Sequence, residues 1–201
     1  MTIAAPSGGG KTTFVQRLLR YSGHLIEPPP QDILFCYTEY QPNYDELVKI
    51  PNVKMVEGIP DLETLRENIS IRKLVIFDDM MLELSHKKDL MNKVFTRVSS
   101  HCNCSCILLT QNLFYENSRT SRINCHYLVL MKNPADQTAV QTLGRQVFPT
   151  QFRFFREVYK EALRQPYSYL LLDLTPSGDD NLRLRTNIFY PDEFTVVYQP
   201  K

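Results

Sequence analysis

A glycine-rich stretch near the N-terminus carries residue types that bind phosphate. It contains, in order, Ala5, Pro6, Ser7, Gly8, Gly9, Gly10, Lys11 and Thr12, with Thr13 following. This is the spacing of a P-loop, with Ala5 where the first glycine usually stands and where only a small residue is required. Three glycines let the backbone curl so that its N–H groups face a phosphate. The stretch predicts a nucleoside triphosphate site, and the alternative is a flexible glycine-rich tail.

The two residues after the glycines add charge and a metal ligand. Lys11 is a compact positive charge suited to the β- and γ-phosphates of the nucleotide. The Thr12 hydroxyl is suited to Mg²⁺, and a helix expected over Thr12–Tyr21 directs its positive end at the bound anion. ATP with Mg²⁺ is therefore the expected ligand.

Two carboxylates follow the apolar run Leu74–Phe77. In a chain with a P-loop, this pattern is typical of a Walker B strand, in which Asp78 would hold Mg²⁺ directly or through water. Asp79 would then orient and polarise the attacking water. The alternative interpretation is that both acids cap a following helix.

Two further polar residues follow expected strands. Gln111 comes after the run Cys104–Thr110 and is a candidate sensor of the γ-phosphate, although a glutamine also commonly terminates a buried strand. Glu39 comes after the run Ile33–Tyr37 and is a candidate for coupling to the acidic pair.

Short apolar runs alternate with segments of helical periodicity, which predicts an α/β layered fold. The continuous apolarity of the runs around Leu74 and Ile107 favours strands buried on both faces, as in a parallel sheet. We expect strands at Ile33–Tyr37, Val53–Val56, Leu74–Phe77, Cys104–Thr110, Tyr127–Met131, Tyr169–Leu174 and Arg183–Phe189, the last two forming a hairpin. We expect helices at Thr12–Tyr21, Asp61–Asn68, Lys87–Ser99, Pro134–Gln146 and Phe152–Leu163. Residues Met1–Ala4 are barely enough for a first strand, so we expect that strand to be incomplete.

Composition sets the class of protein. The 201 residues favour one domain, and 43% hydrophobic with 22% charged residues excludes collagen-like and wholly disordered chains. The net charge of +1 gives no general attraction to nucleic acid, so a DNA contact would need a local basic patch. No apolar run reaches the length of a membrane span, and the first residues do not resemble a signal peptide. Five cysteines spread through apolar segments favour reduced thiols in a cytosolic or nuclear compartment.

Several motifs together resemble one family. The segments GGGKTTFVQRLL, CYTEYQP, VIFDDMM, LLTQNLF, HYLVLMKNPAD, LGRQVFP and LRLRTNIF occur in this order over nearly the whole chain. They resemble the genome-packaging ATPases of Maverick (Polinton) elements and adintoviruses, which are related to the poxvirus-type packaging ATPases of the FtsK–HerA branch of P-loop motors.

The resemblance implies a mostly parallel P-loop fold and a ring-shaped ATPase that moves double-stranded DNA into a capsid. By position, it assigns Lys11 and Thr12 to Walker A, Asp78 and Asp79 to the acidic pair, and Gln111 to the sensor. It also implies capsid proteins as partners, no membrane, and action in the nucleus or cytoplasm of a host cell or in association with a virion.

A ring motor usually completes each site with an arginine from the neighbouring subunit. Arg119 lies where the family usually carries this arginine, and Arg122 and Arg145 are alternatives. Each of them is equally compatible with a surface position or an ion pair within the chain.

Two other groupings suggest binding chemistry but have simpler structural interpretations. A zinc site is suggested by the cysteines at 102, 104 and 106, together with His101 and the later pair Cys125–His126. However, side chains alternate along a strand, so the three thiols would lie on one face, which suits a packed core better than the tetrahedral coordination of zinc. Phenylalanines and arginines between 145 and 156 resemble a nucleic-acid stacking surface, yet they also fit one apolar helix face with solvated arginines opposite.

Two alternative functions follow from the same residues. A nucleotide or nucleoside kinase also combines a P-loop with a strand-borne aspartate, although no arginine-rich lid is evident. A degenerate nucleotide-binding scaffold that no longer hydrolyses ATP is the second alternative.

Overall fold

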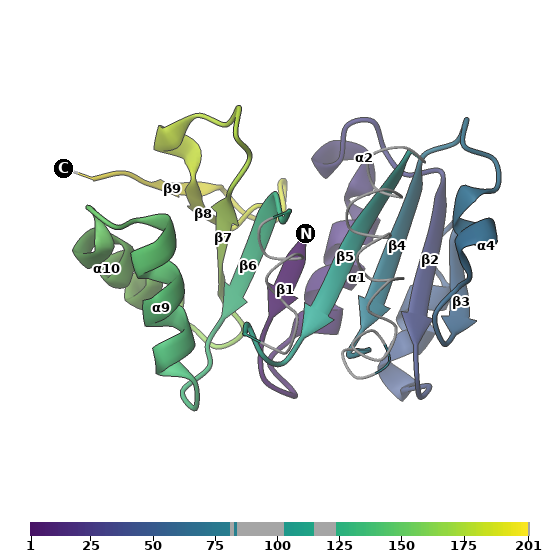
Figure 1. Ribbon diagram of the computed structural model, residues 1–201, viewed down its shortest axis with the longest axis horizontal. Coiled ribbons are helices and arrows are strands. Elements are labelled where there is room, and N and C mark those ends of the chain that lie inside the picture. Colours follow the sequence, from purple (N-terminus) through teal and green to yellow (C-terminus); the bar gives the residue numbers. More distant parts are fainter. Residues whose placement is uncertain (81–82, 84–102, 115–123, 201) are drawn as a thin grey trace.

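Helices cover both faces of one twisted sheet in the computed structural model, which describes residues 1–80, 83, 103–114 and 124–200 (Figure 1). Within these residues, nine strands lie in the order β3-β2-β4-β5-β1-β6-β7-β8-β9. The strands are β1 (Thr2–Ala4), β2 (Asp32–Tyr37), β3 (Val53–Glu57), β4 (Lys73–Asp78), β5 (Cys104–Thr110), β6 (Tyr127–Met131), β7 (Tyr169–Asp173), β8 (Leu184–Thr186) and β9 (Val196–Tyr198). The described helices are α1 (Lys11–Arg20), α2 (Ser22–Leu25), α3 (Asp45–Val48), α4 (Leu62–Arg66), α9 (Gln137–Val147) and α10 (Phe152–Ala162), with 3-10 turns η1 (Pro42–Tyr44) and η3 (Asp180–Leu182).

Strands β1 to β6 are mutually parallel, so their carboxyl ends share one edge of the sheet. The register pairs Ala4 with Thr110 and with Leu130, and it pairs Asp78 with Leu109. The residues that follow β1, β4 and β5 are therefore brought to neighbouring positions at this edge, although they are distant in sequence.

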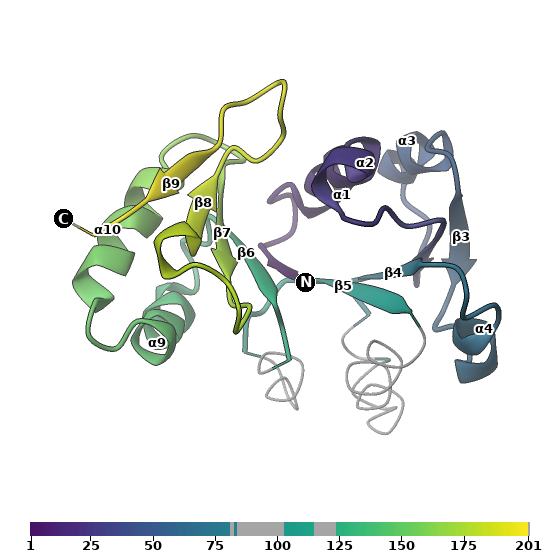
Figure 2. The ribbon, with the colours of Figure 1, turned by 90° about the horizontal axis from the view of Figure 1, so that it is seen from above.

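The hydrophobic core lies on both faces because the central strands β4, β5 and β6 are mostly apolar and buried along their length. On one face, Phe14, Val15, Leu18 and Leu19 of α1 pack against β2, β4, β5 and β6. On the other face, Leu65 of α4 packs over a second cluster that includes Val75 and Phe77. Figure 2 shows α1, α2 and α3 on one side of the sheet and α4 on the other.

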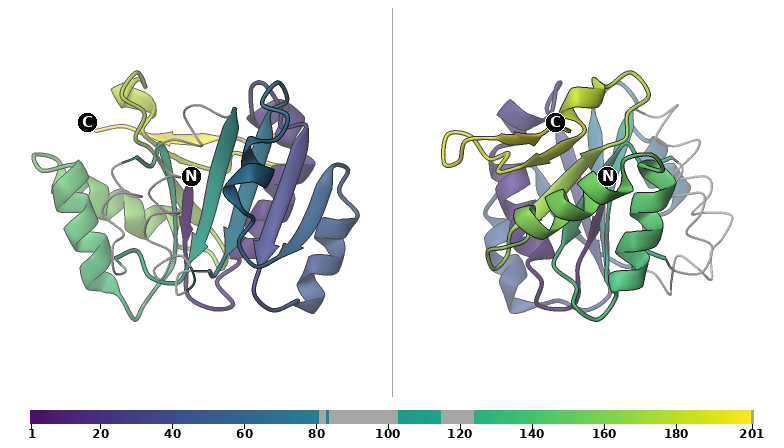
Figure 3. Two further views of the ribbon diagram at one scale, coloured as in Figure 1. Left: turned by 45° about the vertical axis from the view of Figure 1, so that its right-hand side comes forward. Right: turned by 90° about the vertical axis from the view of Figure 1, so that its left-hand side faces the viewer.

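Helices α9 and α10 cover the part of the sheet formed by β6 and β7. The two helices lie side by side on that flank (Figure 3). They approach closely at Gly144, where an added Cβ would lie 2.4 Å from the Phe155 ring. The phenylalanines of this region pack inward, since Phe148 stacks on Phe155 at 5.5 Å and Phe155 is buried.

The segment between β8 and β9 contacts α1 and the residue that follows it. Arg17 donates to Glu193 at 2.7 Å and its guanidinium lies 4.2 Å from the Phe189 ring centre. Tyr21 donates to Asp192 at 2.6 Å. These contacts tie the helix that begins at the phosphate loop to residues about 170 positions later in the chain.

The predicted α/β fold is confirmed, and β5 and β6 have the predicted bounds. The predicted hairpin is confirmed by the antiparallel pairing of β7 with β8. The expected strand Arg183–Phe189 is shorter, because Asn187 adopts a φ of 55° that an extended strand does not allow. Helix α9 begins at Gln137 rather than Pro134, because the Asp136 carboxylate caps it by accepting from the Ala139 N–H at 3.1 Å.

Other elements were not predicted or lie outside the described residues. Strand β9 and helices α2 and α3 were not expected, and each is only three or four residues long. Residues Thr2–Ala4, for which we expected an incomplete strand, form β1 and pair with both β5 and β6. The expected helix Lys87–Ser99 lies outside the described residues. In the part of the chain that the structure describes, no helix has the length and apolarity needed to cross a membrane.

Candidate nucleotide site

The glycine-rich stretch forms the turn between β1 and α1. Gly8 and Gly10 adopt positive φ angles of 70° and 96°, a conformation that side chains strongly disfavour. Gly9 is required for space instead, because an added Cβ would lie 2.8 Å from Ala5 Cβ and 2.9 Å from the Pro6 carbonyl oxygen. Ala5 N–H donates to the Thr110 carbonyl at 3.1 Å, which joins the start of the loop to the end of β5.

Helix α1 begins at Lys11 and points its amino end into this loop. Its first turn contains no acidic residue and Gly10 provides no side-chain cap, so the positive end of the helix dipole is not neutralised by the chain itself. The last turn carries Arg17 and Arg20, which complement the opposite end. The local sequence therefore prepares this end of the helix for an anion.

Lys11 is held inside the loop. Its Nζ donates to the Ala5 and Pro6 carbonyl oxygens at 2.9 and 3.2 Å, and the residue is 8% exposed. Burial lowers the pKa of Lys11, while Asp79 and Asp78 oppose that change. Both carboxylates therefore lie close enough to act on the lysine charge.

Asp78, at the end of β4, is the buried member of the acidic pair. It is 6% exposed, and its Oδ2 accepts a hydrogen bond from the Tyr44 hydroxyl at 2.9 Å and a longer one from the Thr12 hydroxyl at 3.5 Å. Burial raises the pKa of Asp78, and the hydrogen bond from Tyr44 and the Lys11 charge partly offset this. Thr12 at the start of α1 and Asp78 at the end of β4 are thus brought together.

Asp79 lies at the outer tip of β4 and is exposed. Its backbone φ is 52°, and its N–H donates to the Leu109 carbonyl at 3.2 Å, so the chain turns sharply here. The Gln111 side-chain amide donates to Asp79 Oδ2, which joins the residue after β4 to the residue after β5. The two aspartates consequently face different surroundings, one buried and one open to water.

The donor set fits a magnesium ion. Mg²⁺ prefers oxygen ligands and binds through one or two carboxylates together with nucleotide phosphates. Thr12 and Asp78 present a hydroxyl and a carboxylate oxygen to each other beside the phosphate loop. These two residues would hold the ion, which would neutralise the charge of the phosphates.

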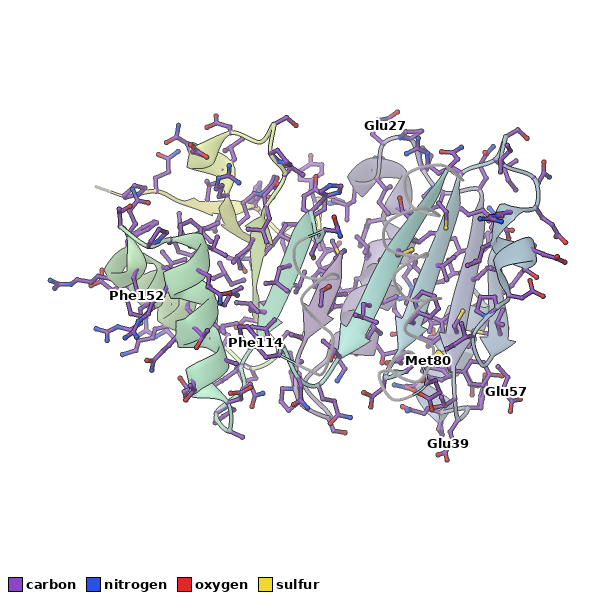
Figure 4. All side chains as sticks on the ribbon, in the orientation of Figure 1. Glu27, Glu39, Glu57, Met80, Phe114 and Phe152 are labelled. Carbon is purple, nitrogen blue, oxygen red and sulfur yellow. The ribbon has the colours of Figure 1, made fainter. Side chains whose placement is uncertain are left out.

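The remaining predicted residues lie elsewhere. Arg145 is exposed on α9, and its guanidinium lies 5.0 Å from the Phe152 ring centre. Met80 follows the acidic pair directly, and Figure 4 shows Phe152 on the opposite flank of the molecule from Met80. Arg145 therefore does not join the site of its own chain. Arg119 and Arg122 lie outside the described residues. Glu39 is exposed at the edge where β2 and β4 end (Figure 4).

The cysteines that suggested zinc are part of the core. Cys104, Cys106 and Cys36 are buried free thiols in the same hydrophobic cluster. Among the described residues, no group of three or more His, Cys, Asp or Glu side chains is placed to hold a metal ion. His101 and Cys102 lie outside the described residues.

Sequence reasoning missed Tyr44. This residue is 1% exposed in η1, and its ring packs against Phe35 at 5.0 Å and against Tyr37 at 5.7 Å. The last residue of β2 and the segment after it carry three tyrosines within eight residues, Tyr37, Tyr40 and Tyr44, and this density of aromatic residues was the available signal. Their role depends on how the segment folds back over the end of β2, which no local pattern specifies.

No protein-family model matches this chain, and no curated protein matches its sequence. Solved structures do match its fold. The cytoplasmic domain of the Thermomonospora curvata type VII secretion ATPase EccC superposes with a TM-score of 0.57 at 11% identity, covering 91% of this chain and 26% of that one. The pCW3 conjugation coupling protein TcpA, solved with ATPγS, superposes with a TM-score of 0.52 at 11% identity, covering 96% of this chain and 61% of that one.

The chain therefore shares its fold with these two proteins. The chain spans only about a quarter of EccC and three fifths of TcpA, so it corresponds to one part of each of these proteins. A third structure, the genome-packaging NTPase B204 of Sulfolobus turreted icosahedral virus 2 with AMPPCP, has a TM-score of 0.49 at 9% identity and covers 100% of this chain and 96% of that one.

Proposed function

We propose that this protein binds Mg-ATP on its P-loop and hydrolyses it to drive movement of double-stranded DNA. The observation that carries the ATPase part is the convergence of five side chains at one edge of the sheet. Lys11, Thr12, Asp78, Asp79 and Gln111 come from three separate elements and are joined by hydrogen bonds or charge.

In this proposal, the phosphates lie on the backbone N–H groups of the loop and on the amino end of α1. Lys11 exchanges its carbonyl partners, Ala5 and Pro6, for the phosphates when nucleotide arrives. The carbonyl contacts keep the lysine in place until then, so little reorganisation is needed at binding.

The two aspartates would divide the work. Buried Asp78, with Thr12, holds the metal ion, whose charge stabilises the phosphates. Exposed Asp79 orients the attacking water, and Gln111 fixes the Asp79 carboxylate through its amide. The Gln111 amide carries a second N–H that could donate to the γ-phosphoryl group while the first holds Asp79, so this residue is suited to sense whether the group is present.

The DNA part of the proposal rests on the sequence resemblance to Maverick-type packaging ATPases. It includes a homo-oligomeric ring, a capsid partner, and action in the nucleus or cytoplasm of a host cell or with a virion. In a ring, Arg119 or Arg145 of one subunit would complete the site of its neighbour, an effect worth about 10³–10⁵ in rate. Arg145 is exposed on α9, so it is accessible to a neighbouring subunit in this proposal.

The test is ATP hydrolysis by the purified chain, with and without long double-stranded DNA. We expect turnover that rises with DNA and falls at least about 100-fold in Lys11→Ala. Lys49→Ala is the matched control, because Lys49 is exposed and, among the described residues, forms its ion pair with Glu46 three residues earlier. It should retain full turnover.

Other outcomes point to the alternatives. Phosphoryl transfer to a nucleoside with none to water would establish a kinase and refute the motor. Binding of Mg-ATP without turnover, with or without DNA, would favour the scaffold.

A further inference from the structure

One exposed aromatic residue borders the phosphate loop. Tyr167 lies in the turn between α10 and β7, and 75% of its surface is exposed. Strand β7 runs antiparallel to β6, with Tyr169 opposite Met131, so β7 begins at the edge where β6 ends. Figure 1 shows the chain entering β7 at the same edge as the loop after β1.

The Tyr167 side chain lies beside the last glycine of the loop. A Cβ built on Gly10 would lie 3.4 Å from Tyr167 Cδ1 and 4.0 Å from the Met131 sulfur. Gly10 is the residue before α1, so the ring stands directly beside the amino end of the helix. Phosphates bound to the loop would leave the rest of the nucleotide to extend onto the neighbouring surface, and this ring is part of that surface.

The backbone holds the ring in an unfavourable conformation. Tyr167 has a φ of 59°, which is rare for a bulky residue and is typical of functional positions. The turn is closed by the Ser168 hydroxyl, which donates to the Gln165 carbonyl at 2.7 Å. Tyr169 is anchored in the core against Phe14 of α1 at 4.8 Å. The exposed ring is therefore fixed relative to α1.

We propose that Tyr167 is the platform on which the base of the bound nucleotide stacks. This assignment rests on the proposed nucleotide site and adds the residue that recognises the base. Bases stack on aromatic side chains regardless of sequence, because each base has a π face. Stacking on Tyr167 would add affinity for a nucleotide over inorganic polyphosphate, because polyphosphate has no base and would contact the loop alone.

The test is a binding titration of the full chain with Mg-ATP and with magnesium tripolyphosphate. The deciding variant is Tyr167→Gly, because glycine adopts a φ of 59° without strain and its loss of the ring does not threaten the fold. We expect ATP affinity to fall about 5- to 150-fold, the range measured for base stacking, with tripolyphosphate affinity unchanged. Tyr167→Phe should keep the ATP affinity, and Phe194→Ala, which removes another exposed ring, should change neither ligand.

A spectroscopic readout is independent of affinity. The chain contains no tryptophan, so Tyr167→Trp would carry the only indole. Its fluorescence should be quenched by Mg-ATP and unaffected by tripolyphosphate.

The outcomes separate the two proposals. Equal loss of both ligands in Tyr167→Gly, or unchanged ATP affinity, would overturn the platform while the nucleotide site stands. A wild-type chain that binds neither ligand would overturn both.

Discussion

Replacing Tyr44 by phenylalanine tests whether the aromatic segment after β2 supports the metal-binding carboxylate. The change removes one hydroxyl, which donates to Asp78 Oδ2 at 2.9 Å in a buried position, and leaves the ring in place against Phe35. The remaining donor to that oxygen, the Thr12 hydroxyl, lies at 3.5 Å and compensates little.

The size of the effect follows from the charge of the acceptor. Hydrogen bonds to charged groups contribute about 1.5–3 kcal/mol, and for a chain of this length each kcal/mol changes Tm by about 2–4 °C. We therefore expect Tyr44→Phe to unfold about 3–12 °C below the wild type at neutral pH.

The loss should depend on pH. The hydrogen bond from Tyr44 lowers the pKa of Asp78, against the larger effect of burial, so its removal raises that pKa further. The hydrogen bond stabilises the ionised carboxylate more than the protonated one. The wild type should therefore exceed Tyr44→Phe in unfolding free energy by the full amount at pH values where Asp78 is ionised in both folded proteins. This difference should shrink as the pH falls through the pKa of Asp78.

Thermal unfolding from acid to neutral pH measures both the loss of Tm and its pH dependence, with Tyr21→Phe as the matched control. Tyr21 also donates to an aspartate, Asp192, but at an exposed site, and its loss should change Tm little. An unchanged Tm in Tyr44→Phe, or an equal loss at acid and neutral pH, would refute the reasoning.

Three further predictions concern burial. Burial raises the pKa of Asp78, so keeping its carboxylate ionised in the folded chain costs stability as the pH rises to neutral. Asp78→Asn should therefore have a higher Tm than the wild type at neutral pH while ATP turnover disappears; a lower Tm would contradict this. Gly144→Ala should lose about 1–3 kcal/mol in denaturant unfolding, since its Cβ would meet Phe155 at 2.4 Å, whereas Gly23→Ala, with nothing within 4 Å, should be neutral. Burial raises the pKa of Cys36 to about 12, so mass spectrometry after iodoacetamide treatment should find Cys36 alkylated only once the chain is unfolded.

The sequence alone was sufficient wherever local chemistry decides the outcome. The spacing of the glycines before Lys11 predicted a tight turn into a helix, and the apolar run ending in Asp78 is long enough to specify a buried strand. Periodicity therefore predicted most of the strands and helices that build the α/β fold, and residue types predicted which strand ends carry the candidate site residues.

Tertiary structure decided which distant residues meet. The contact of Tyr44 with Asp78 spans 34 positions and that of Tyr167 with Gly10 spans more than 150, and neither is encoded by a local pattern. The parallel register brings the ends of β1, β4 and β5 to one edge, where burial separates Asp78 from Asp79 although the two are adjacent in sequence. The physical reason is that burial and electrostatic environment depend on what packs around a side chain, and most of those neighbours come from remote parts of the chain.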